Sequence, residues 1–140
     1  MVSRGITLLE MLAVILLVGI IAALALPGYR QQMRRVYRTE AMIALLELQN
    51  AEEKYFLRHN AYSGNISTAP PTGLGLATSS SSNKYFLSIA VASDGHSFIA
   101  TATPTAEGGQ ASDLECLAFS IDARGRRAVS GNRDVRYCWK

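Results

Sequence analysis

The chain has 140 residues and a formal net charge of +3, with 14 Lys and Arg against 11 Asp and Glu. When an apolar N-terminal segment of roughly 30 residues is set aside, roughly 110 remain, which is enough for one small domain with a single core and favours one domain over two. Because the net charge is modest, the placement of the basic residues says more about partners than their total does.

The first element is an apolar run over residues 6–26, in which Glu10 is the sole charge. At about 1.5 Å per residue, a helix of this length spans about 31 Å, which matches the hydrocarbon core of a bilayer. A carboxylate inside such a helix costs about 2.5–3.5 kcal/mol to insert, so its presence calls for a partner or a purpose. Glu10 is therefore the first candidate functional residue.

A short basic leader precedes the run, and the junction reads Gly5-Ile6-Thr7-Leu8-Leu9-Glu10. This block resembles the prepilin signal of type IV pilins and the related pseudopilins. The resemblance implies that a prepilin peptidase cuts between Gly5 and Ile6 and methylates the new amino terminus. It also implies that Glu10 is the fifth residue of the mature chain.

Two simpler interpretations of this segment stay open, namely a cleaved secretory signal peptide and a plain membrane anchor. Ala23-Leu24-Ala25 offers a signal-peptidase site, but a carboxylate at the head of the apolar core argues against a signal peptide. The positive-inside rule would place the domain inside, because Arg4 alone precedes the segment and several Arg follow it. The leader and the two cysteines, which suit an oxidising compartment, favour the opposite orientation.

Residues 29–60 continue the helix with an amphipathic pattern. Apolar residues recur every three or four positions and predict one stripe that packs on a sheet. The stripe consists of Tyr37, Ala41, Ala44, Leu48, Ala51 and Tyr55.

Two helix-weakening sites, Gly19 and the pair Pro27-Gly28, lie before this amphipathic part. Pro27 and Gly28 predict a kink or local unwinding, because Pro lacks a backbone donor and crowds the preceding turn. Gly19 occupies the position where pilins carry a helix-weakening Gly, so the resemblance implies that residues 19–27 melt on assembly. The alternative is a pair of breakers tolerated in a membrane helix.

The rest of the chain is predicted to be a loop followed by an antiparallel meander. Residues 60–83 contain Pro70-Pro71 and a run of Ser, which are typical of a loop. Alternation over residues 85–91, the turn signal Asp94-Gly95 and a β-rich run over 96–103 predict a hairpin. Residues 116–121 and 126–130 predict two more strands around a turn. The fold class is therefore α+β, with a long N-terminal helix packed on a small antiparallel sheet, and pilins share this plan.

The two cysteines, Cys116 and Cys138, leave no odd thiol and would close a C-terminal loop. A disulfide closing a loop of about 22 residues would contribute about 3 kcal/mol in chain-entropy models. The alternative is a metal site, but His59 and His96 have no ligand spacing relative to either Cys. We therefore expect a disulfide, no metal and no cofactor.

The sequence lacks the nucleophile elbow, the phosphate-binding loop and the zinc-protease helix motif, so no enzymatic activity is expected. The last 17 residues instead hold a basic cluster beside Tyr137 and Trp139, opposed by Asp134 alone. Arg pairs with phosphates and Trp stacks on bases, so the composition fits a weak DNA-contacting surface. A solvated or subunit-facing edge would have the same composition and stays open. The cluster consists of Arg124, Arg126, Arg127, Arg133, Arg136 and Lys140.

The resemblance to pilins implies a structural subunit of a type IV pilus. The hairpin opening Lys84-Tyr85-Phe86-Leu87 and the tail over 134–140 look most like the PilE-type minor pilins. The implied parts are a leader over 1–5, a transmembrane and filament-core helix over 6–28 and a periplasmic domain over 29–140. The protein would cross the bacterial inner membrane once, in contact with lipid. An inner-membrane assembly platform would then pass it into an extracellular pilus.

In the fibre, the resemblance implies that Glu10 pairs with the amino terminus at Ile6 of a neighbouring pilin subunit, which neutralises both charges. Such a subunit would support pilus biogenesis, twitching motility and adhesion. Three related readings stay open. A major pilin would differ only in abundance, a type II secretion pseudopilin usually carries a calcium loop and no disulfide, and a receptor pilin for DNA uptake would use the basic cluster.

Overall fold

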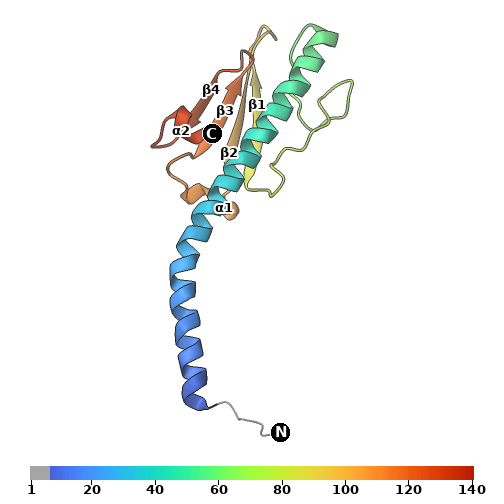
Figure 1. The fold of residues 1–140 in the computed structure, drawn as a ribbon. Helices are drawn as coiled ribbons and strands as arrows, with labels where there is room; N and C mark the ends of the chain where they lie inside the picture. The colour runs from blue at the N-terminus through green and yellow to red at the C-terminus, as the bar shows by residue number, and fades with distance from the viewer. Residues whose placement is uncertain (1–6) are drawn as a thin grey trace. The chain divides into compact units, whose positions relative to one another are not determined.

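The computed structural model describes residues 7–140. Within them, a long helix is followed by four strands and three short helical segments (Figure 1). The helices are α1 (Leu8–His59), the 3-10 turns η1 (Ala106–Gly108) and η2 (Gln110–Ser112), and α2 (Val135–Cys138). The strands are β1 (Tyr85–Val91), β2 (Phe98–Pro104), β3 (Ala118–Asp122) and β4 (Arg127–Ser130). Contacts divide the chain into two compact units, one ending at Arg35 and the other covering Val36–Lys140.

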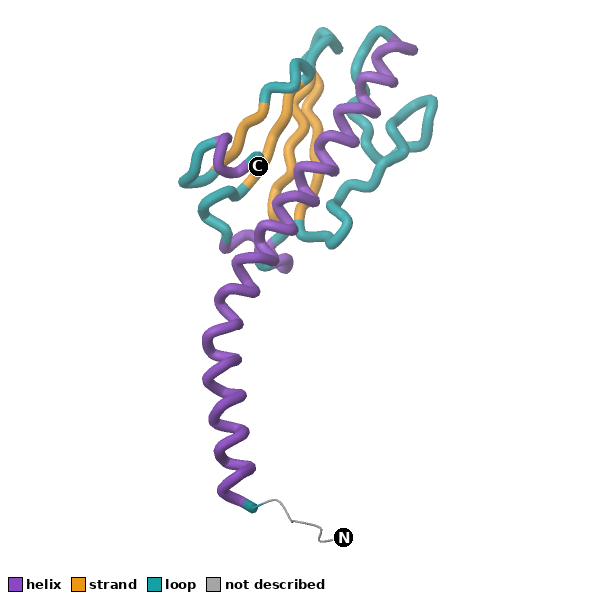
Figure 2. The backbone as a smooth tube through the Cα atoms, in the orientation of Figure 1, coloured by secondary structure: helices purple, strands orange, loops and turns teal. Residues whose placement is uncertain are grey.

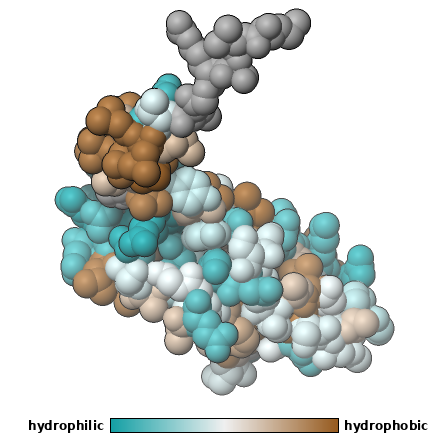
Figure 3. All heavy atoms as spheres, turned by 90° about the horizontal axis from the view of Figure 1, so that it is seen from below, coloured by the Kyte–Doolittle hydropathy of each residue, from teal (hydrophilic) through white to brown (hydrophobic). Residues whose placement is uncertain are grey.

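The first unit is the N-terminal half of α1, whose apolar side chains are uncovered. Every large apolar side chain that is exposed between Leu8 and Leu26 has at least 50% of its surface accessible. Figure 3 shows such residues gathered as a brown group on the helix. The length and composition of this half are sufficient for a helix that crosses a bilayer.

The helix passes through Gly19, Pro27 and Gly28 without a break (Figure 2). Of the kink or local unwinding expected at Pro27 and Gly28, the unwinding is therefore wrong, while the kink stays a prediction. A proline removes one backbone donor, but the helical hydrogen bonds of the flanking turns remain available. In an apolar segment, each backbone group that left the helix would lose its partner, which favours continuity. Melting of residues 19–27 concerns assembly and stays a prediction.

The C-terminal half of α1 packs on the sheet through the side that its apolar spacing predicts. Ala41 and Leu48 are fully buried. The buried face also includes Leu45 and Glu52, which have no exposed surface and lie beside the predicted stripe. The apolar pattern could not find Glu52, because carboxylates are rare in cores. The partly buried members of the stripe are Tyr37, Ala44, Ala51 and Tyr55.

The four strands form one antiparallel sheet in chain order, as the sequence predicts. Thr101 in β2 pairs with Ser88 in β1 and with Ser120 in β3, which fixes the register. The β1–β2 turn has Gly95 at φ 71°, a left-handed conformation that glycine adopts without strain. Strands β2, β3 and β4 begin one or two residues later than predicted. The buried residues of the sheet are Tyr85, Leu87, Phe98, Ala100, Ala102, Phe119 and Ile121.

Both outer strands of the sheet have neighbours. Beside β1, the Leu87 amide donates to the Thr78 carbonyl at 2.8 Å, and Ser79 forms a bridge with Phe86. On the other side, β4 has four residues and contacts α2. The helix α2 was not anticipated from the sequence. Its N-cap is the Asp134 carboxylate, which accepts from the Tyr137 amide at 2.8 Å.

Candidate functional site

The start of α1 carries the first candidate residue, Glu10. Thr7 precedes the helix, and its hydroxyl oxygen accepts from the Glu10 amide at 3.2 Å. Thr followed three residues later by Glu is the signature of a capping box, so Glu10 also favours the start of the helix. The proposed cleavage and methylation positions, Gly5 and Ile6, lie outside the described residues. At Gly19, an added Cβ would meet nothing within 4 Å, so no close contact requires glycine there.

The disulfide predicted from the cysteine count joins Cys116 and Cys138, with 5.7 Å between their Cα atoms. Both residues are buried, so the bridge belongs to the core of the domain. It links Cys138, the last residue of α2, to Cys116, which lies two residues before the start of β3. Backbone bonds close the same loop, since the Arg133 amide donates to the Glu115 carbonyl at 3.1 Å.

The C-terminal basic cluster falls into two groups, and the first surrounds the turn between β3 and β4. The Arg126 guanidinium contacts the Asp122 carboxylate at 2.6 Å. Burial acts to raise the pKa of Asp122, but hydrogen bonds from Arg126 and from the Arg124 amide hold it below its usual range. The Arg126 charge is therefore already paired.

Trp139 links this turn to the end of the chain. Its indole N–H donates to the Ala128 carbonyl at 3.1 Å, and its ring packs edge-on against Phe119. The Arg127 guanidinium lies 4.9 Å from the centre of the same ring. The indole N–H and the ring of Trp139 thus both have partners within the domain, and stacking of Trp139 on bases stays a prediction.

The second group of the cluster surrounds Tyr137. The Arg133 guanidinium lies 5.1 Å from the centre of the Tyr137 ring and 3.5 Å from the Glu115 carboxylate. The Tyr137 hydroxyl donates to Glu115 at 3.2 Å. Hydrogen bonds from Arg38 and Tyr137, with the nearby charge of Arg133, lower the pKa of Glu115.

Beneath this group lies a buried ion pair that sequence reasoning missed. Arg38 in α1 donates two hydrogen bonds of 2.6 Å to Asp113, whose side chain has 1% of its surface exposed. Hydrogen bonding to Asp113 raises the pKa of Arg38 despite burial, so the guanidinium stays charged. Arg38 also donates to Glu115 at 3.2 Å. The network thus ties α1 to the disulfide-bonded tail, and no local pattern could reveal a contact between residues 75 positions apart.

Residues 27–120 match the family model described as "Type IV minor pilin ComP, DNA uptake sequence receptor". The chain belongs to the type IV pilins. It is 38% identical over 90 residues to a fimbrial protein of Neisseria meningitidis serogroup B, covering 64% of this chain and 50% of that protein. It is 29% identical over 140 residues to the fimbrial protein EcpC of Eikenella corrodens, covering 97% and 88%.

A type IV major pilin, PilE1 of Neisseria gonorrhoeae, is 34% identical over 90 residues, covering 64% of this chain and 40% of that pilin. The chain thus spans about half the length of the first curated relatives it matches. A type IV pilin structure from Shewanella oneidensis shares the fold, with a TM-score of 0.50, 24% identity and coverage of 67% and 89%. The pilins are a family of structural proteins rather than of enzymes.

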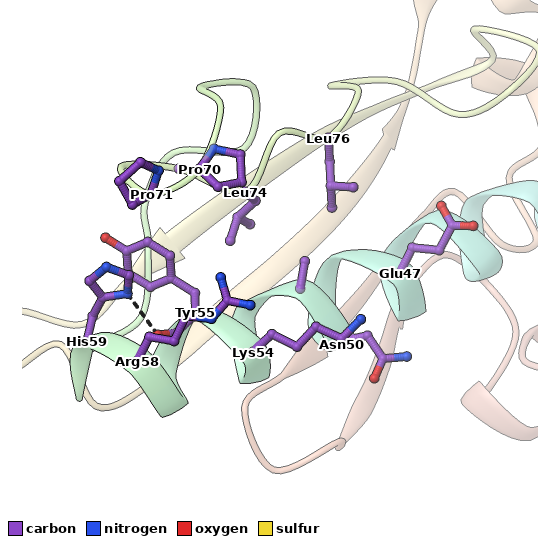
Figure 4. Close-up of a pocket in the computed structure, with 12 residues that line it drawn as sticks. Glu47, Asn50, Lys54, Tyr55, Arg58, His59, Pro70, Pro71, Leu74 and Leu76 are labelled. Carbon is purple, nitrogen blue, oxygen red and sulfur yellow. Dashed lines mark hydrogen bonds between the residues drawn. The ribbon is translucent and has the colours of Figure 1, made fainter.

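The family match ends at residue 120, before the first residue of the basic cluster. A second surface feature of this pilin lies inside the matched range, between α1 and the loop after it. It is a groove of about 440 Å³. Figure 4 shows Leu74 and Leu76 pointing from the loop toward the helix, while Lys54 and Arg58 extend from α1. The Tyr55 ring, stacked on His59 at 4.0 Å, also lines it.

Proposed function

We propose that this pilin is a minor subunit of a type IV pilus, which enters the filament through α1. The observation that supports the proposal is the continuity of α1, which joins an uncovered apolar half to a half that is packed in the domain. An element of this kind can exchange lipid for the apolar helices of other subunits while the domain stays folded.

We assign three parts to the chain on this basis. Residues 1–5 would be removed as a leader, residues 6–28 would form the transmembrane and filament-core helix, and residues 29–140 would form the periplasmic domain. Processing by a prepilin peptidase and delivery by an inner-membrane assembly platform follow from the same proposal. Twitching motility and adhesion would be properties of the whole pilus.

Glu10 would set the position of the subunit in the fibre. Among the described residues up to Tyr29, it is the sole charged side chain of α1. A carboxylate enclosed by apolar helices needs a cation, because burying an unpaired charge is costly. The amine that cleavage would create at Ile6 of a neighbouring subunit is such a cation.

The test is Glu10→Val, co-expressed with the parent chain. We expect the variant to be cleaved after Gly5 and held in the membrane, while its recruitment into filaments falls about tenfold or more, the effect of losing about 1.4 kcal/mol. Intact mass gives the cleavage site, and subunit counting in purified fibres gives recruitment. Glu47→Val, which removes an exposed carboxylate of the same helix, is the matched control. Equal recruitment of the Glu10→Val chain and the parent would disprove the pairing.

A second candidate function is DNA binding during uptake, which the description of the matching family favours. Within the described chain, Arg124, Arg136 and Lys140 form no ion pair and are exposed, whereas Arg126 and Arg133 face carboxylates. The exposed group would contact phosphates. Since phosphate contacts carry no sequence information directly, this surface alone would bind DNA without strong sequence preference.

The DNA proposal is tested with the full chain in detergent micelles and a short duplex. Each lost phosphate contact should reduce the slope of log affinity against log salt by about 0.9. We therefore expect a reduced slope for Arg124→Ala with Arg136→Ala, and little change for Arg58→Ala, an exposed Arg of α1 that serves as the control. No binding by the parent chain at about 50 mM salt would exclude this function, because low salt favours phosphate contacts.

A further inference from the structure

A buried carboxyl in the core of the domain forms no ion pair with any residue between 7 and 140. Glu52 lies in the second half of α1 and has no exposed surface. Its Oε2 atom accepts from the Ser63 amide at 2.8 Å, while its Oε1 atom is buried without a hydrogen-bond partner among the described residues. The charge that acts on it is that of the Glu53 carboxylate, which disfavours ionisation, and Glu52 in turn helps to raise the pKa of the Tyr62 hydroxyl.

Two adjacent glutamates of α1 hold the first residues of the loop over 60–84. Glu52 binds the Ser63 amide, and Glu53 accepts from the Tyr62 hydroxyl at 3.1 Å. Tyr62 also packs edge-on against Phe98, and its amide donates to the Gly95 carbonyl at 2.9 Å. Of these two glutamates, Glu52 is the one shielded from water, so a negative charge on Glu52 carries the larger desolvation cost.

We propose that Glu52 is a proton-sensitive anchor of the loop over 60–84, which holds the loop on α1 while neutral and loosens it when ionised. A neutral carboxyl leaves one hydroxyl without an acceptor, which is far less costly than a buried charge without a cation. An ionised Glu52 accepts the Ser63 amide more strongly, but one amide does not replace the water that a carboxylate loses. Opening of the loop start would restore that water.

The pKa of Glu52 is shifted in the direction that its burial predicts. Burial, reinforced by the nearby charge of Glu53 and opposed by the Ser63 amide, raises the pKa of Glu52 from 4.5 to about 7. A pKa that is higher in the folded state means that the folded chain binds the proton more tightly than the unfolded chain. The contribution of Glu52 to the free energy of unfolding is therefore fully present below about pH 4.5, and it is lost as the pH rises through about 7.

The loop that Glu52 anchors also forms one wall of the groove beside α1. Pro70, Pro71, Leu74 and Leu76 of the loop face Tyr55 and Lys54 of the helix across that groove (Figure 4). Loosening at Ser63 would release the segment that leads to this wall. The pH would thus control the shape of the groove as well as the stability of the domain.

The first experiment follows the Glu52 carboxyl carbon by NMR in the full chain in detergent micelles. We expect a titration midpoint near 7 in the parent chain, and a midpoint near 4.5 would overturn the proposal. Because this measurement needs no substitution, it stands even where a variant fails to fold.

The second experiment compares hydrogen exchange of the Ser63 amide, corrected for intrinsic rates, between about pH 5 and about pH 8. Protection in the parent chain should fall about tenfold or more over this range, while Glu52→Gln, which keeps the acceptor and the shape, should lose none. Glu47→Gln is the control for an exposed carboxyl of the same helix and should behave like the parent. An equal loss in the parent and in Glu52→Gln would overturn the proposal.

Discussion

The two halves of α1 are both rich in apolar residues, yet their surroundings differ. Between Leu8 and Leu26 the large apolar side chains are uncovered, whereas Ala41, Leu45 and Leu48 are fully buried. The second half obtains its cover from a sheet of the same chain. The first half is uncovered, and apolar surface of this kind is stabilised by contact with an apolar environment such as lipid or other apolar helices. Folding of the domain and assembly of the helix therefore depend on separate sets of contacts, which substitutions can separate.

The largest expected effect on the domain is that of Asp113→Ala. It leaves the Arg38 guanidinium buried without its bidentate partner, which should cost about 3–5 kcal/mol of unfolding free energy. Urea unfolding of the full chain in detergent micelles measures the loss. Replacing both partners, as in Arg38→Met with Asp113→Leu, should recover most of it. A loss below about 1 kcal/mol in Asp113→Ala would mean that the pair does not hold α1 to the tail.

A matched pair of leucines tests the two halves directly. Leu48→Ala removes a fully buried side chain and should cost about 2–5 kcal/mol of unfolding free energy. Leu16, in the first half, is 66% exposed, so Leu16→Ala should change the stability of the domain by less than about 0.5 kcal/mol. The same unfolding measurement serves both variants. Similar losses in the two would show that the halves fold as one unit.

Among the predictions for the ion pair, the buried leucine and the disulfide, the smallest loss of unfolding free energy is expected on removal of the disulfide. Replacing Cys116 and Cys138 with Ser should cost at most about 3 kcal/mol, because the bridge closes a short loop. Circular dichroism should show that α1 stays formed, since its buried face shares the core with sheet side chains such as Leu87 and Phe98, which remain when the bridge is removed. Hydrogen exchange should rise in α2. Unfolding of α1 together with the tail would contradict this separation.

The sequence predicted features that repeat at short spacing. The apolar stripe of α1, the hairpin around Asp94-Gly95 and the order of the strands follow from local periodicity and turn chemistry. The pairing of Cys116 with Cys138 followed from the count of cysteines. Each of these inferences needs only a few neighbouring residues or a residue type that occurs twice.

Contacts between distant residues could not be predicted in the same way. Arg38 lies in a helix and Asp113 in a loop 75 positions later, and one sequence gives no sign that they meet. Glu52 has the composition of a surface residue, and its burial follows only from the path of the loop around Ser63. Trp139 fits a base-stacking residue by type, but the fold engages it with Arg127 and Ala128.

The covered sides of the sheet restrict how this chain can polymerise. An open strand would accept a strand of another molecule through its backbone, and growth by that route leads to aggregates. Here residues 78–80 occupy part of the outer side of β1, while β4 offers four residues with α2 next to them. The apolar half of α1, by contrast, carries a series of uncovered large apolar side chains from Leu8 to Leu26, so we expect self-association of this pilin to use that helix rather than the outer strands of the sheet.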